Sequence, residues 1–152
     1  MTDVAVIELV GAACALVGTV CAGTVAHECT HAAVLAGFGV PYEIEWFPRT
    51  RGFAGSRALA SVTPRSIPAG LPRWRLRTAA IVPVVLTVPF WPVVVGLVPD
   101  PLRTGGPAVQ AAAVGWLACA IPSPADFSLF WHAGEFVDGA TADPERPDQD
   151  GR

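Results

Sequence analysis

The feature that most constrains this chain is a long apolar segment near its N-terminus. Between Val4 and Ala26 the only charged side chain is Glu8. As an α-helix these residues would extend ~35 Å, more than the ~30 Å hydrocarbon core of a bilayer. A cleaved signal peptide is disfavoured, because no basic residue precedes the segment and its apolar run is too long. The sequence therefore predicts a transmembrane helix over about residues 4–36.

A second apolar segment predicts a helix over about residues 78–98. It contains three prolines, which would break a soluble helix but which membrane helices tolerate as kinks: Pro83, Pro89 and Pro92. The overall composition also favours a lipid-facing protein. Apolar residues make up 52% of the chain, its mean hydropathy is +0.47, and charged residues make up only 15%. A typical soluble domain carries about 25% charged residues.

The third apolar segment predicts a helix over about residues 108–131 that breaks near its end. Pro122 and Pro124 interrupt it, and Asp126 then stands among apolar residues. The chain is thus expected to be mainly α and integral to the membrane, with three transmembrane helices in one core domain (residues 1–137). Residues 138–152, rich in Asp, Pro and Gly, are expected to form a disordered acidic tail.

The region between the first two segments predicts a short β-hairpin over about residues 42–63. Tyr42–Phe47 alternates acidic and apolar residues, which is typical of a strand, and Ser56–Thr63 is a plausible partner strand beyond a turn-rich stretch. Basic residues also gather between the segments. The chain has no lysine, and seven of its ten arginines fall there: Arg49, Arg51, Arg57, Arg65, Arg73, Arg75 and Arg77.

These arginines favour a cytoplasmic loop over a nucleic-acid-binding surface, because they lie between hydrophobic segments. The loop then fixes the topology of a multi-pass protein of the cell membrane. The first helix runs inward, the second runs outward and the third runs inward again. His27, His31 and Asp126 are therefore expected at similar depth near the cytoplasmic side, although they are far apart in the sequence.

The first segment carries the pattern HExxH over His27–His31. On a helix, residues four apart share a face, so the two imidazoles can bind one zinc ion. Glu28 lies one residue further round, where its carboxylate can take a proton from water activated by the ion instead of binding the ion itself. Ionisable groups inside a membrane segment are costly and are functional by default, so we favour this site over a polar helix-packing patch.

Catalytic zinc usually has three protein ligands, so one more must come from outside the motif. Asp126 is the best candidate, being a lone carboxylate in an apolar segment. Glu135 and His132 are the alternatives, but they lie nearer the C-terminus, where an ordinary interfacial residue is the simpler interpretation.

The HECTH motif at His27–His31, the β-like stretch after it and the Asp126 of IPSPADF resemble the site-2 protease family of intramembrane zinc metalloproteases, in a minimal core version. The resemblance covers roughly residues 4–131. It implies a core of three transmembrane helices, with a hairpin between the first two that binds substrate as an added strand. It further implies that His27, His31 and Asp126 are zinc ligands and that Glu28 is the catalytic base.

Two features depart from the family's pattern. Phe127 follows the aspartate where the family has glycine, and no asparagine precedes the prolines of the third segment, so no oxyanion-stabilising side chain is identified. We expect no regulatory domain of the PDZ type beside the core.

Together these features predict a membrane-embedded zinc metalloendopeptidase that hydrolyses peptide bonds of membrane proteins or peptides. The edge of Tyr42–Phe47 would hold the extended substrate through backbone hydrogen bonds. One alternative is a non-catalytic membrane protein that binds metal for storage, sensing or transport, although the second segment offers few polar residues for transport. Another is an assembly subunit whose histidines only pack. Nothing in the sequence specifies an oligomeric state.

Overall fold

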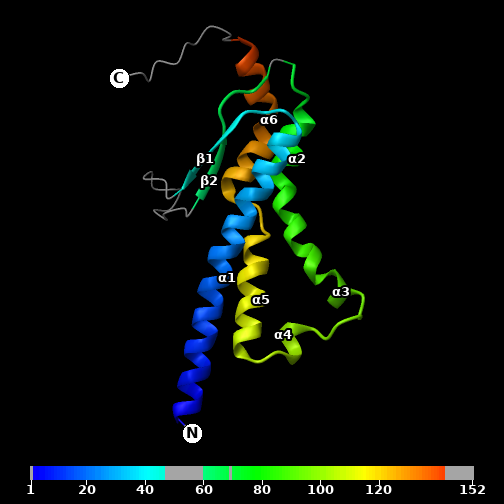
Figure 1. Cartoon of the computed structure of the whole chain (residues 1–152). Coiled ribbons are helices and arrows are strands. Elements are labelled where there is room, and N and C mark those ends of the chain that lie inside the picture. The colour runs from blue at the N-terminus through cyan, green and yellow to red at the C-terminus, as the bar shows by residue number, and fades with distance from the viewer. Residues whose placement is uncertain (1, 47–59, 69, 143–152) are drawn as a thin grey trace, which may run out of the picture.

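The computed structural model describes residues 2–46, 60–68 and 70–142 of the 152-residue chain, and this part is mainly helical (Figure 1). Helix α1 runs along most of the length of the molecule, α5 packs along it, and α6 packs against α2. In chain order the elements are α1 (Thr2–Gly37), β1 (Tyr42–Trp46), β2 (Ala60–Pro64), α2 (Arg73–Ile81), the 3-10 helix η2 (Val82–Phe90), α3 (Trp91–Val94), α4 (Pro101–Thr104), α5 (Pro107–Cys119) and α6 (Pro124–Ala142).

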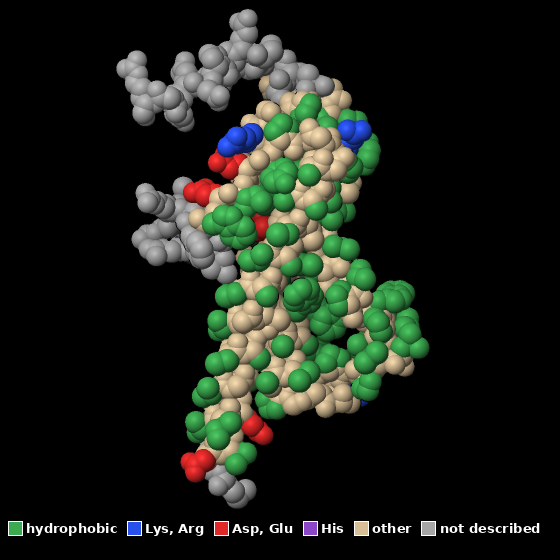
Figure 2. All heavy atoms as spheres, viewed as in Figure 1, with side chains coloured by type: hydrophobic (Ala, Val, Ile, Leu, Met, Phe, Trp, Pro, Cys, Tyr) green, Lys and Arg blue, Asp and Glu red, His purple; other side chains and the backbone are tan. Residues whose placement is uncertain are grey.

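Three helical stretches are long and apolar enough to cross a membrane, as the sequence predicted: Asp3–Gly37, Arg73–Val94 and Pro107–Gly139. The second begins and ends a few residues earlier than predicted. Many large apolar side chains are exposed; Leu9, for example, keeps 70% of its surface. Figure 2 shows these hydrophobic side chains over the middle of the molecule, while most of the visible charged side chains lie near its ends.

The predicted hairpin is present as a two-stranded antiparallel sheet. Tyr42 pairs with Pro64 at one end and Trp46 pairs with Ala60 at the other. β2 thus ends one residue beyond the predicted strand. Residues 47–59, which include Phe47, the start of that predicted strand and Arg49, Arg51 and Arg57, lie outside the described residues.

Prolines set where the second and third apolar segments change conformation. The second changes from an α-helix to a 3-10 helix at Val82, next to Pro83. The third breaks between α5 and α6 at Pro122 and Pro124, as the sequence predicted. A proline has no N–H and its ring displaces the carbonyl four residues earlier, so a regular α-helix cannot continue through it.

The C-terminal helix is longer than predicted, which corrects the expected start of the disordered tail. α6 continues to Ala142, so residues 138–142 are helical. The carboxylate of Asp138 accepts two hydrogen bonds from Nη2 of Arg73, at 2.9 and 3.1 Å, and this contact joins the end of α6 to the start of α2. Residues 143–152 lie outside the described residues.

Small residues bring α1 and α5 close together. A Cβ added at Gly23 would lie 2.8 Å from Sγ of Cys119, and one added at Gly115 would lie 3.2 Å from the backbone oxygen of Leu16. Such small-residue contacts are typical of packing between membrane helices. At the hairpin end of the molecule, a buried apolar cluster joins α1, α2 and α6, through Leu35, Val40, Leu71, Leu76, Ala79, Ala133 and Val137.

Candidate metal centre

The two histidines of the HExxH motif lie on the buried side of α1. His27 and His31 are one helical turn apart, and each exposes only 7% of its surface. Their Nε2 atoms are 3.2 Å apart. The pair therefore presents two ring nitrogens to one point, as the spacing of four residues predicted.

Asp126 of α6 brings its carboxylate to the same point. Its Oδ2 lies 3.3 Å from Nε2 of His27, and its Oδ1 lies 3.1 Å from Nε2 of His31. Bonds of about 2.0–2.1 Å to a tetrahedral ion would place neighbouring ligand atoms about 3.3 Å apart. The three side chains can therefore hold one metal ion.

The hydrogen bonds of the two Nδ1 atoms, which point away from Asp126, determine which tautomer each histidine adopts. Nδ1 of His27 lies 2.7 Å from the carbonyl oxygen of Cys119, and Nδ1 of His31 lies 2.7 Å from the carbonyl oxygen of Ala79. A carbonyl only accepts hydrogen bonds, so both Nδ1 atoms must carry the proton. In a neutral imidazole this leaves the lone pair on Nε2, which is the form that binds metal.

The three converging groups are consequently all hydrogen-bond acceptors. The two Nε2 lone pairs and the carboxylate of Asp126 face one another at distances of 3.1–3.3 Å. A single proton at this point would bridge only one of the three pairs. A metal ion can bind the lone pairs of all three groups at once, so these side chains fit a cation such as zinc.

Ser123 fixes the carboxylate, a role that the sequence analysis missed. The backbone N–H of Ser123 donates to Oδ2 of Asp126 at 2.6 Å, and the hydroxyl of Ser123 accepts from the N–H of Asp126 at 3.2 Å. This reciprocal pair is a capping box at the start of α6, with Pro124 in the first helical position. The sequence signal was Ser-Pro-Ala-Asp, the S-x-x-D pattern of such a start.

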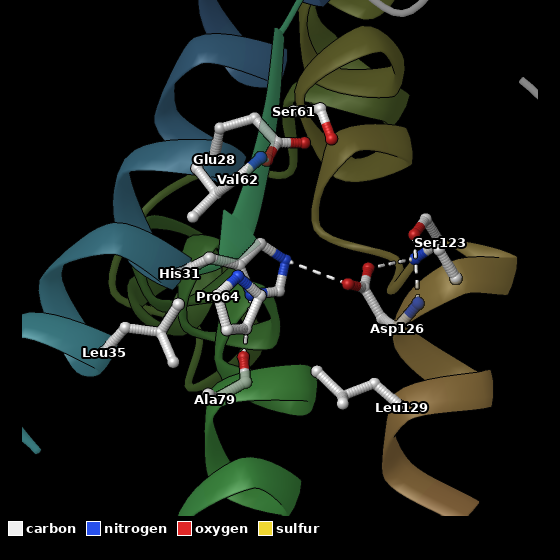
Figure 3. Close-up of a pocket in the computed structure, with 11 residues that line it drawn as sticks. Glu28, His31, Leu35, Ser61, Val62, Pro64, Ala79, Ser123, Asp126 and Leu129 are labelled. Carbon is white, nitrogen blue, oxygen red and sulfur yellow. Dashed lines mark hydrogen bonds and ion pairs between the residues drawn. The ribbon is translucent and has the colours of Figure 1, made fainter. Parts of the chain in front are cut away.

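Glu28 lies beside the group and is held by the hairpin. Its Oε2 accepts a hydrogen bond from the backbone N–H of Val62 in β2 at 2.9 Å. Glu28, His31 and Asp126 together line a small cavity of about 90 Å³, and Ser61 and Val62 lie beside Glu28 in its wall (Figure 3). The cavity is large enough for a water molecule between the carboxylate of Glu28 and the ligand group.

A second, more open hollow of about 250 Å³ lies on the other side of Glu28. Glu28 and Ser123 line both hollows, while Thr24, His27 and Cys119 line only this one. Small and apolar side chains make up most of its wall. The candidate site is therefore accessible from two sides.

The alternative third ligands do not join this group. His132 and Glu135 line a separate open hollow on α6, and Nδ1 of His132 lies 3.0 Å from the carbonyl oxygen of Ser128 on the same helix. Of the described residues, only His27, His31 and Asp126 form a set of at least three potential ligands.

The strand that contacts Glu28 is β2, through the backbone N–H of Val62. The sequence analysis predicted that the Tyr42–Phe47 edge holds the substrate, and that stays a prediction. The chain matches no protein-family model, no curated protein and no solved structure.

Proposed function

We propose that this protein is a membrane-embedded zinc metalloendopeptidase of the site-2 protease type. The observation that carries the proposal is the convergence of His27, His31 and Asp126, with the carboxylate of Glu28 in the adjoining cavity. The three helices of membrane-spanning length support a location in the bilayer. On this proposal the enzyme is a multi-pass protein of the cell membrane, and the arginine distribution supports a site near the cytoplasmic side.

Each residue of the site has a role in this proposal. His27, His31 and Asp126 would hold the zinc ion, and a bound zinc ion supplies Lewis acidity that polarises a peptide carbonyl and acidifies water. Glu28 accepts the proton from the attacking water and then passes it to the leaving amine. The two hollows beside Glu28 give water and a peptide access to this carboxylate.

The proposed substrate is a membrane protein or peptide in an extended conformation. A peptide backbone must reach Glu28 to be cleaved, and the nearest strand is β2, whose residues Ser61, Val62 and Pro64 line the same cavity as Glu28. Strands in a sheet are about 4.8 Å apart, so a peptide added to the far edge of β1 would lie two strand spacings from β2. We therefore favour the β2 side for substrate binding.

The Glu28→Gln variant tests the proposal. Glutamine keeps an oxygen that can accept from Val62 but cannot take a proton, so cleavage of a transmembrane-peptide library by the purified protein should fall by about 10²–10⁴-fold. Zinc content, measured by elemental analysis, should not change. Glu135→Gln is the matched control, because Glu135 lies outside the ligand group.

The outcomes separate the alternatives. If Glu28→Gln cleaves as fast as the wild type, the proposed role of Glu28 is wrong. If the wild type binds one zinc ion but cleaves nothing, a non-catalytic metal-binding protein is the better description. If the wild type holds no zinc, the histidines serve packing only.

A further inference from the structure

We propose that Pro83 and Pro122 are positioning residues of the metal centre, each leaving free the backbone carbonyl that orients one histidine. This inference rests on the proposed zinc site. Neither proline can donate a backbone hydrogen bond to the ligand group, because proline has no N–H. Each proline acts because it removes a backbone N–H that would otherwise donate to the carbonyl.

Pro83 acts on the carbonyl that holds His31. In an α-helix the carbonyl of Ala79 would accept a hydrogen bond from the N–H of residue 83. Residue 83 is a proline, so this donor is missing, and the ring also displaces the carbonyl four residues earlier. The carbonyl of Ala79 instead lies 2.7 Å from Nδ1 of His31. Pro83 is fully buried, so its ring is fixed at this point.

Pro122 acts in the same way on the carbonyl that holds His27. The carbonyl of Cys119 at the end of α5 could accept from residue 122 or residue 123. Residue 122 is a proline, and the N–H of Ser123 already donates to Asp126 at 2.6 Å. Both local donors are thus accounted for. The carbonyl of Cys119 lies 2.7 Å from Nδ1 of His27.

The same device occurs at a third position that holds no metal ligand. In the 3-10 helix η2, the carbonyl of Leu86 would accept from residue 89, which is Pro89. The indole N–H of Trp116 donates to this carbonyl at 2.8 Å and so joins η2 to α5. Prolines in this chain therefore expose carbonyls to side chains of neighbouring helices, and two of the three exposed carbonyls orient the histidines.

The Pro83→Ala variant tests the inference. It restores an N–H that can compete with His31 for the carbonyl of Ala79, so the hydrogen bond to Nδ1 of His31 should weaken, and with it the preference for a proton on Nδ1. In metal-free protein in detergent micelles, nitrogen NMR of labelled histidine should show His31 changing from the Nδ1–H tautomer to a mixture. Zinc affinity, measured by competition with a chromophoric chelator, should fall by about 10- to 100-fold.

Two control variants isolate the effect. Pro89→Ala makes the same change in the same segment but concerns the carbonyl that binds Trp116, so the histidine signals and zinc affinity should stay at wild-type values. Leu86→Ala empties buried volume in the same segment without supplying an N–H, and it should also leave the His31 tautomer unchanged. If Pro83→Ala fails to fold, Pro122→Ala provides the same measurement on His27.

The result that overturns the inference is a wild-type tautomer and zinc affinity in the proline variants. An equal loss in Pro89→Ala or Leu86→Ala would also overturn it, because the cause would then be a general loosening of η2. Absence of zinc from the wild type would instead reject the proposed function, while the tautomer measurement would still decide the role of the prolines.

Discussion

The hydrogen bond from Val62 to Glu28 predicts that a backbone amide of the hairpin contributes to catalysis. The N–H of Arg65 donates to the carbonyl of Pro41 at 2.9 Å, so the amides of residues 61, 63 and 65 face β1. Backbone groups alternate along a strand, which directs the N–H of Val62 away from β1 and toward Glu28. A proline at this position therefore removes the hydrogen bond to Glu28 without removing a hydrogen bond between the strands.

The expected magnitude follows from the charge of the acceptor. A hydrogen bond to a charged group contributes about 1.5–3 kcal/mol, and each ~1.4 kcal/mol changes a rate about tenfold. Val62→Pro should lower kcat by about 10- to 100-fold if the full contribution of the contact goes to orienting Glu28. Zinc content should not change, because no ligand or ligand-orienting carbonyl is altered.

The assay is peptide cleavage under saturating substrate, with Ala60→Pro as the matched control. Ala60 lies two residues earlier on the same strand, and its amide has no hydrogen bond to Glu28 in the described part of the chain. The reasoning is refuted if Val62→Pro keeps the wild-type kcat or loses no more than Ala60→Pro. A higher kcat in Val62→Pro would refute it as well, because the contact would then restrain Glu28 in an unproductive position.

Two further predictions concern the ligand group. Ser123→Ala removes one half of the capping box and should destabilise the protein by about 1 kcal/mol and weaken zinc binding, whereas Ser123→Thr should keep the stability and the zinc affinity of the wild type. Thermal melts measure the stability and zinc titration measures the affinity. A wild-type zinc affinity in Ser123→Ala would contradict the prediction. Zinc at about a hundredfold excess over its Kd should raise the Tm by about 5–10 °C, because it binds the folded protein and not the unfolded chain. The rise should be absent in His27→Ala, and an equal rise in that variant would place the zinc elsewhere.

The three side chains of the candidate metal centre could be predicted from the sequence, but the groups that orient them could not. The HExxH spacing places two imidazoles on one helix face, and the charge asymmetry along the chain predicted that Asp126 lies near them. The orienting groups are the carbonyls of Ala79 and Cys119, and every residue has a carbonyl, so residue identity does not distinguish them. The sequence marks these carbonyls only indirectly, by Pro83 four residues after Ala79 and by Pro122 three residues after Cys119.

The extent of α6 shows a second limit of sequence reasoning. Composition predicted disorder from residue 138 onward, because acidic residues, Pro and Gly are frequent there. Composition does not indicate tertiary partners, and Asp138 has one in Arg73 of α2. Arg73 at the start of α2 thus contacts Asp138 in the C-terminal half of α6.

Each side chain of the candidate site is held by a different part of the fold. His31 is held by α2, His27 by the end of α5, Asp126 by the first turn of α6 and Glu28 by β2. Only Asp126 is held locally, by Ser123 directly before α6, whereas the other three side chains are held by elements outside their own helix. The geometry of the centre therefore depends on the packing of α1 against all its neighbours, and the close contacts at Gly23 and Gly115 are where that packing leaves no space for a larger residue.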